Sequence, residues 1–252
     1  MIGTAPKGDL FQRVLSVMIW RVAKKAGAVT ALSRPLGDLM VSRYKVATTI
    51  LKIIPTCTDL AKFTRSEINL DSQIILLSGV FNDFYDLELT KEFIEIYKQI
   101  ENVEVVWAHG IEALRNSLNV GEDRIVVLAS HEVPELIKMS TFGIAFCRFD
   151  AGESLKGVVP TKIAEFLASG RPVVVSSGMG DLDKILQENQ AGIVVQQEGD
   201  LYQAARQIQE LIRNPETPEN CWAVAKKYFD LDWAVQEYKA TYTTLIGQHK
   251  KS

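Results

Sequence analysis

The sequence predicts a doubly wound α/β domain, in which a parallel sheet of about six strands carries helices on both faces. Short runs of apolar and β-branched residues alternate with helical patterns, which is typical of βαβ units. The strand runs from residue 74 onward are continuously apolar, as in residues 74–77, which is typical of strands covered on both faces. A composition of 47% hydrophobic and 23% charged residues is that of an ordinary globular chain.

The elements of this domain follow one another without a long gap. The predicted strands are residues 74–79, 103–108, 124–129, 143–149, 172–176 and 192–196. The predicted helices are residues 87–100, 111–118, 133–140, 161–169, 182–189 and 201–213. A further helical pattern covers residues 219–245.

The first 64 residues do not repeat this pattern. They offer a helix at 10–25, a strand at 28–32, a short helix at 35–44 and a strand at 51–55. Two strands cannot make a doubly wound sheet, so we expect residues 1–64 to be the remnant of a preceding domain plus a linker. The sheet domain then spans residues 65–228, and residues 229–252 form a closing helix that crosses back to the first part.

Composition excludes several classes of protein. The net charge of −3 gives no basic field for nucleic acid. The three cysteines and three histidines are scattered, which predicts no disulfide framework and no metal site and suits the cytoplasm. The helix at 10–25 interleaves apolar and basic residues, so two interpretations stand: a packed domain helix, or a peripheral contact with the inner membrane surface.

Residues 157–175 read as a loop, a helix, a tight stop and a buried strand. Pro160 suits a first helical turn, where its missing N–H costs nothing, and Gly170 suits the position just past the helix end. Ile163, Phe166 and Leu167 share the face that we expect to cover the sheet.

The start of this helix predicts an anion site. The expected capping residue, Val159, has no side-chain oxygen, so the first amides and Lys162 form a cradle suited to a diphosphate. Glu165 would then accept hydrogen bonds from ribose hydroxyls. The alternative is a Lys162–Glu165 pair on a solvated helix face, which contributes only ~0.2–0.5 kcal/mol.

The run Pro-x-Lys-x-x-Glu-Phe-Leu-Ala-x-Gly-x-Pro-Val at residues 160–173 closely resembles the donor-site signature of the retaining GT-B glycosyltransferases of group 1, also called family 4. Other segments resemble that family in the right order, so the resemblance covers nearly the whole chain. They are residues 28–33, 53–63, 77–79, 133–136 and 228–245.

The resemblance implies a Rossmann-like C-terminal domain of the GT-B fold, with the N-terminal domain largely missing. It implies a metal-independent, cofactor-free hexosyltransferase of polysaccharide biosynthesis. Such an enzyme moves a sugar from a nucleotide-diphosphate sugar to a glycan or lipid-linked acceptor. The sequence assigns no catalytic residue, because the acceptor side of a GT-B active site lies in the other domain.

The resemblance also implies a donor site. Glu165 would bind the ribose, and Gly157, Val158 and Val159 would bring backbone amides near the phosphates and sugar. Gly79 would allow close approach of the donor, and Val133 would line the base pocket through its backbone. Asn82 and Thr161 complete this set of donor-binding residues.

The chain departs from the family at two places. Many relatives carry a basic pair after the first strand of this domain, whereas residues 81–86 here read Phe-Asn-Asp-Phe-Tyr-Asp. Lys162 and Arg148 would hold the phosphates instead. Gly157 stands where relatives with two motif glutamates carry an acid.

Two other functions remain open from the sequence. The first is a binding module for a nucleotide sugar, or a subunit of a split transferase that is completed by a separate N-terminal chain or by self-association. The second is a nucleotide-sugar epimerase, a class that shares the two-domain architecture.

Overall fold

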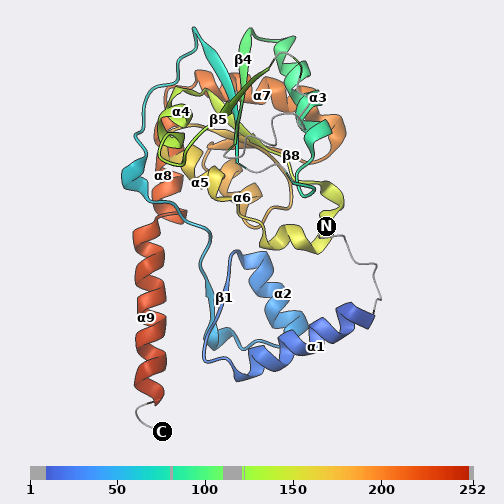
Figure 1. Cartoon of the computed structure of the whole chain (residues 1–252), viewed down its shortest axis with the longest axis vertical. Helices are drawn as coiled ribbons and strands as arrows, with labels where there is room; N and C mark the ends of the chain where they lie inside the picture. The colour runs from blue at the N-terminus through green and yellow to red at the C-terminus, as the bar shows by residue number, and fades with distance from the viewer. Residues whose placement is uncertain (1–9, 80–81, 110–120, 122, 250–252) are drawn as a thin grey trace.

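The computed structural model describes residues 10–79, 82–109, 121 and 123–249. A layered α/β domain occupies one end of the molecule in Figure 1, and the first helices and strands lie below it. The last helix runs down one side of the molecule, past those N-terminal elements.

The α/β domain is built on a six-stranded parallel sheet. Its strands lie in the order β5-β4-β3-β6-β7-β8. Their bounds are β3 Gln73–Ser78, β4 Val103–His109, β5 Arg124–Val127, β6 Phe142–Ala145, β7 Val173–Ser176 and β8 Gly192–Val195. The chain order reverses between β3 and β6, and in such sheets ligands bind beyond the carboxyl ends of the strands at this switch point.

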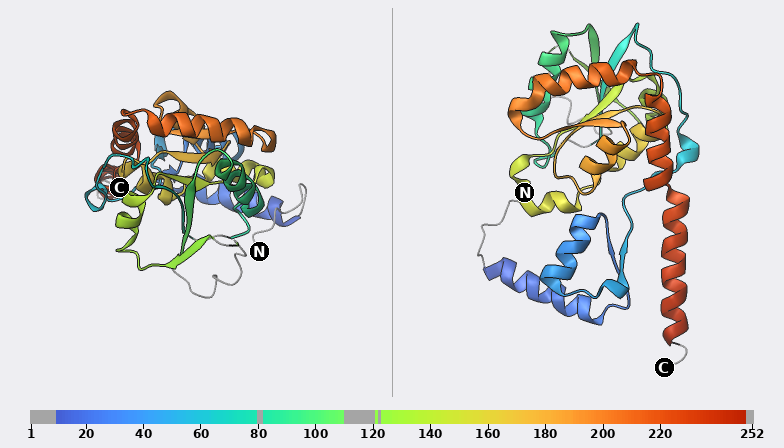
Figure 2. Two further views of the ribbon diagram at one scale, coloured as in Figure 1. Left: turned by 90° about the horizontal axis from the view of Figure 1, so that it is seen from above. Right: turned by 180° about the vertical axis from the view of Figure 1, so that it is seen from behind.

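Alternate residues of the strands enter two separate cores, because successive side chains of a strand point to opposite faces. Ile75 and Leu77 pack with α3 (Leu87–Lys98) and α7 (Leu201–Arg213) on one face. Leu76 packs on the other face, with α4 (Val133–Met139), α5 (Thr161–Ala168), α6 (Leu182–Glu188) and α8 (Thr217–Tyr228). Figure 2 shows the helices on both sides of the sheet, as the continuously apolar strands predicted.

One close approach fixes α5 against the sheet. Phe166 is fully buried and lies over Gly143 of β6. A Cβ atom on Gly143 would lie 2.5 Å from the Phe166 ring, a distance that real Cβ atoms do not show. Ile163 and Leu167 are also buried in the same core, so all three predicted sheet-facing residues are confirmed. This contact therefore fixes the position of α5 over β6.

The N-terminal elements form a small unit of their own. The helix α1 (Leu10–Lys25) precedes β1 (Val29–Ala31), and α2 (Arg34–Tyr44) precedes a short 3-10 turn at Thr48–Ile50. The strand β2 (Leu51–Ile53) then pairs with β1 in parallel, with Val29 opposite Leu51. Two further 3-10 segments lie at Leu60–Lys62 and Phe149–Gly157, and a third at Glu198–Asp200.

The C-terminal helical pattern is divided in two. The helix α8 ends at Tyr228 and α9 (Leu231–His249) begins three residues later. The linker lies at the break, where Thr58 donates its amide to Phe229 O and accepts the Leu231 amide at its own carbonyl. Beyond this crossing α9 lies beside the N-terminal elements, where Lys52 pairs with Glu237 at 3.4 Å.

The predicted strands and helices are present wherever the structure describes the chain, with ends shifted by a few residues. The predicted strands 124–129 and 143–149 are shorter, ending at Val127 and Ala145. The predicted helix at 111–118 lies outside the described residues. None of the helices in the described ranges has the length and apolar character needed to cross a membrane.

Candidate functional site

The first turn of α5 lies at the carboxyl edge of the sheet. The helix begins at Thr161, and its capping residue is Pro160, not Val159 as we predicted. The shift arises because Pro160 keeps an extended backbone, with φ −63° and ψ 131°, while its carbonyl accepts the Ile163 amide at 3.0 Å. A proline offers no side-chain oxygen either, so the helix start still has no side-chain cap.

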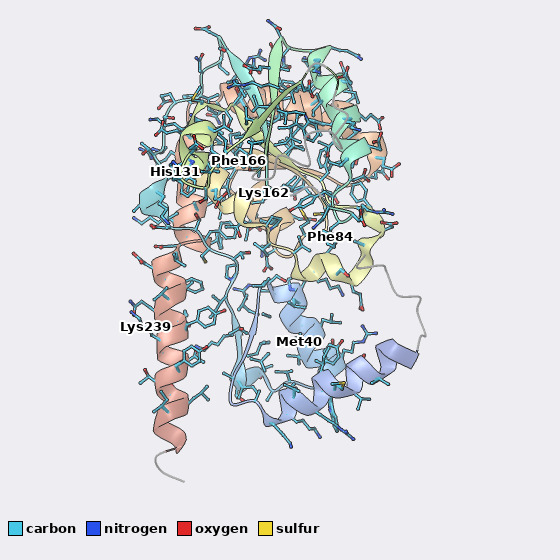
Figure 3. All side chains as sticks on the ribbon, in the orientation of Figure 1. Met40, Phe84, His131, Lys162, Phe166 and Lys239 are labelled. Carbon is cyan, nitrogen blue, oxygen red and sulfur yellow. The ribbon has the colours of Figure 1, made fainter. Side chains whose placement is uncertain are left out.

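Lys162 is buried, with only 9% of its surface exposed. Its Nζ lies 4.1 Å from the centre of the Tyr85 ring, and its terminal atoms lie directly beside Gly79 at the end of β3. Burial lowers the pKa of Lys162 to about 8, against the opposing effects of Cys147 and Glu165. The interpretation of Lys162 as part of a solvated surface pair is therefore wrong, because its side chain is buried. Figure 3 labels Lys162 within the sheet domain.

Glu165 lies one turn further along α5 and is half-buried. Burial raises the pKa of this carboxyl, and the nearby charge of Lys162 opposes the rise. A half-buried carboxylate retains acceptor capacity for hydroxyl donors while being held by a helix rather than a loop.

Sequence reasoning missed Tyr85, whose ring covers Lys162. The segment that carries it lies along the end of β6: Tyr85 bridges Cys147, and Arg148 donates its amide to Phe84 O at 3.1 Å. Burial raises the pKa of Tyr85 to about 12, so its hydroxyl stays protonated. The available signal was the aromatic pair at residues 84 and 85, in the stretch where many relatives carry basic residues.

Gly79 and Asn82 flank this segment. Gly79 has φ +104°, a backbone conformation that favours glycine, and a side chain there would point at Lys162. Asn82 is exposed, and its Oδ1 accepts the Phe84 amide at 3.1 Å. Its carbonyl accepts the Tyr85 amide at 2.9 Å. Asn82 thus shapes the turn that leads to Tyr85.

The guanidinium of Arg148 is already engaged. It makes two hydrogen bonds to Asp150, at 2.7 and 3.0 Å, and its side chain is 52% exposed. The carboxylates of Asp150, Asp86 and Asp83 all raise the pKa of Arg148. A phosphate at Arg148 would have to compete with these acidic neighbours.

The backbone at 157–159 packs against the N-terminal unit, which sequence reasoning did not predict. The Val158 amide, which we expected to face the phosphates, is hydrogen-bonded to Leu155 O at 2.9 Å, so a phosphate would have to compete for it. Ser33 Oγ donates to Lys156 O, and Thr56 Oγ1 donates to Val159 O. Leu36 of α2 lies against Gly157.

Thr161 and Val133 occupy two helix starts at the same edge of the sheet. Thr161 is exposed at the first position of α5. Val133 is half-buried at the first position of α4, which follows β5. The two helices are packed against each other. Within the described ranges, no group of three or more His, Cys, Asp or Glu side chains is arranged to hold a metal ion.

Comparison with solved structures shows the fold. A glycosyltransferase of Rickettsia africae matches with a TM-score of 0.70 at 13% identity, over 91% of this chain and 67% of that one. HepE of Anabaena, solved with UDP, gives 0.72 at 13% identity, over 96% and 70%. A Staphylococcus aureus TarM variant, solved with UDP, gives 0.67 at 12% identity, over 91% and 46%. The chain thus has the fold of these glycosyltransferases and spans about two thirds of the length of the first two.

No curated protein sequence matches the chain. A family model described as glycosyl transferases group 1 matches residues 74–214, which is more than half of the 252 residues. That range contains β3 to α7 and therefore Gly79, Tyr85, Lys162 and Glu165. The chain belongs to the group 1 glycosyl transferases.

Proposed function

We propose that this chain carries the donor site of a retaining, metal-independent hexosyltransferase that uses a nucleotide-diphosphate sugar. One observation carries the proposal: an α5 start without a side-chain cap lies beside a buried lysine at the switch point of the sheet. A helix start of this kind favours phosphate through its amides and its dipole. HepE, which shares the fold, was solved with UDP and with UDP-glucose, which supports a nucleotide sugar as the ligand.

In this proposal Lys162 contacts the diphosphate and Glu165 accepts hydrogen bonds from the ribose. A diphosphate placed beside Lys162 favours the charged amine, so it offsets the burial that lowers the pKa of Lys162 to about 8. Gly79 has no side chain between the ligand and Lys162. The remaining members of the proposed site are Gly157, Val158, Val159, Thr161, Asn82, Val133 and Arg148.

The same groups would assist the reaction. Negative charge grows on the diphosphate as the bond to the sugar breaks, and preorganised donors stabilise that charge best where water is excluded. The α5 amides and the Lys162 ammonium supply such donors without a metal ion or other cofactor. We assign no catalytic residue to the described part of the chain.

We propose a division into residues 1–64 as acceptor-domain remnant and linker, 65–228 as donor domain and 229–252 as the crossing helix. The described elements support it, since the N-terminal unit holds a two-stranded sheet and the donor domain a six-stranded one. The acceptor would be a glycan or a lipid-linked sugar. A transfer assay on this chain alone, and with a polypeptide supplying a full acceptor domain, separates an enzyme from a binding module or split subunit.

The exposed face of α1 supports a lipid-linked acceptor. Val14, Val17, Met18 and Val22 lie at helical spacing and are about half or more exposed. The helix α1 contains four basic residues and no acidic one. We propose that this face meets an anionic membrane surface, which vesicle co-sedimentation with and without phosphatidylglycerol tests.

Titration calorimetry tests the donor site directly. We expect UDP, GDP or ADP to bind more tightly than about 1 mM, which corresponds to about −4 kcal/mol. The Lys162→Met variant should lose diphosphate affinity while keeping affinity for the bare nucleoside. If none of the three nucleotides binds the wild-type chain, the donor-site proposal fails.

A further inference from the structure

The first turn of α2 is wedged against two loops of the sheet domain. The first is residues 156–160, which lead into α5, and the second is residues 177–181, which lead from β7 into α6. We refer to them as the α5 loop and the α6 loop. The contacts join a part of the chain that precedes the linker to the backbone beside Lys162.

Ser33 links α2 to the α5 loop through a single hydroxyl. It is fully buried and caps α2, because its Oγ accepts the Leu36 amide at 3.1 Å. The same Oγ donates to Lys156 O, and nearby Thr56 donates to Val159 O. Two carbonyls of the α5 loop are therefore held by side chains of the N-terminal part.

Asp181 links α2 to the α6 loop. Its Oδ2 accepts the Arg34 amide at 2.8 Å, which satisfies one of the first amides of α2 and places a negative charge at that helix start. Asp181 precedes α6, yet its side chain makes no capping hydrogen bond to that helix. The carboxylate therefore serves α2 rather than its own helix.

Gly180 is the spacer between the two loops. It has φ +52°, and a Cβ atom there would lie 3.0 Å from Ser33 Cβ and from Val159 Cγ2. Its amide donates to Leu155 O at 3.0 Å. The α2 turn, the α6 loop and the α5 loop are thus stacked with no room for a further side chain at Gly180.

We propose that the first turn of α2 positions the α5 loop for the diphosphate, and that Ser33 and Asp181 are positioning residues for nucleotide binding. A peptide unit is planar, so fixing the carbonyl of Lys156 also fixes the direction of the following amide. Fixing this loop before the ligand arrives reduces the ordering cost of binding. The inference rests on the proposed nucleotide function of the site.

The first test needs no ligand. Hydrogen exchange on the free chain should show the amide of Gly157, which follows the held Lys156 carbonyl, and the amides of residues 161–163 exchanging about tenfold faster in Asp181→Ala and Ser33→Ala. Asp181→Asn keeps an acceptor oxygen and should restore most of the protection. Asp38→Ala and Ser42→Ala are matched controls, since Asp38 and Ser42 are exposed on the same helix and Ser42 Oγ bonds Asp38 O within it.

The second test measures affinity. Asp181→Ala should weaken UDP binding about tenfold, which equals ~1.4 kcal/mol, while uridine affinity stays within about twofold. Asp181→Ala keeps the Ser33 cap of α2. It therefore still tests the proposal if Ser33→Ala loosens the fold.

The outcomes separate the two ideas. If the wild-type chain binds UDP and both variants match it in affinity and in exchange, the positioning role is overturned. If the variants speed exchange at residues 161–163 but the wild-type chain binds no nucleoside diphosphate, the positioning stands and the proposed function fails.

Discussion

Replacing Lys162 by methionine should stabilise the free protein while weakening diphosphate binding. Methionine has a similar length and keeps most of the packing, but it carries no charge into the buried site. Burial lowers the pKa of Lys162 from 10.5 to about 8, and this shift corresponds to about 3 kcal/mol of lost stability at pH 7. The lost contact with the Tyr85 ring offsets about 1 kcal/mol. We therefore expect a net gain of at most about 2 kcal/mol at pH 7.

The gain should depend on pH in a defined direction. Because the folded pKa of Lys162 lies below its unfolded value, the unfolded chain binds more protons between about pH 8 and 10.5, and wild-type stability gains from rising pH in that window. Burial raises the pKa values of Cys147 and Tyr85 above their ordinary 9.0 and 10.0, so those groups destabilise the fold from about pH 9 upward in both proteins. Cys147 and Tyr85 stay protonated in the folded state up to pH 9, so over this range the difference between the two proteins reports mainly on Lys162, and it should shrink by about 1 kcal/mol from pH 7 to pH 9.

Urea unfolding followed by circular dichroism at pH 7, 8 and 9 measures this difference. Lys184→Met is the control, because Lys184 is 77% exposed on α6, and it should shift stability by less than about 0.5 kcal/mol at each pH. A Lys162→Met protein that is less stable than wild type at pH 7, by an amount that does not change with pH, would refute the reasoning.

Three further predictions address the site and its support. Glu165→Ala should weaken both UDP and uridine by about 1–3 kcal/mol, and equal uridine affinity in calorimetry would remove Glu165 from the ribose. Diphosphate binding at pH 8 should take up about half a proton as Lys162 becomes fully charged, which calorimetry in HEPES and Tris buffers, whose ionisation enthalpies differ, measures; zero uptake would contradict the burial of its charge. Gly143→Ala should destabilise the fold by about 1–3 kcal/mol, because the added methyl meets the Phe166 ring; an unchanged urea midpoint would show that the ring moves aside at no cost.

The sheet domain was predictable from sequence because its local signals agree. Strands β3 and β6 to β8 are short apolar runs, and each is separated from the next by a helical pattern or a turn. The helix start at Thr161 was predicted, but the capping residue was placed one residue early, because Pro160 is acceptable both in a first turn and at the cap. The single helical pattern at 219–245 is two helices, and the break lies at Phe229, where the distant Thr58 is hydrogen-bonded.

The candidate site was predictable only in part. Lys162 and Glu165 belong to one local motif, so their spacing on α5 was visible in the sequence. The covering of Lys162 by Tyr85 depends on two segments that meet only in the folded sheet. The hydrogen bond of Ser33 to the α5 loop joins residues 123 positions apart in the sequence, and local patterns carry no information about such pairs.

The crossing at Thr58 and Asp230 restricts how the two ends of the molecule can move. At this crossing the linker and the segment between α8 and α9 both connect the sheet domain to the N-terminal unit and α9, and the hydrogen bonds of Thr58 join the two segments. Beyond the crossing, the ion pair of Lys52 with Glu237 and the contact of Leu245 with Gly27 hold α9 against the N-terminal unit, so we expect the two to move together. A single connecting segment would allow rotation about every axis. Two hydrogen-bonded segments resist twisting of one part against the other and permit mainly bending about one axis. Because the α2 turn already contacts the α5 loop, such bending would move the N-terminal unit away from Lys162 and would break the hydrogen bonds of Ser33 and Thr56 to that loop.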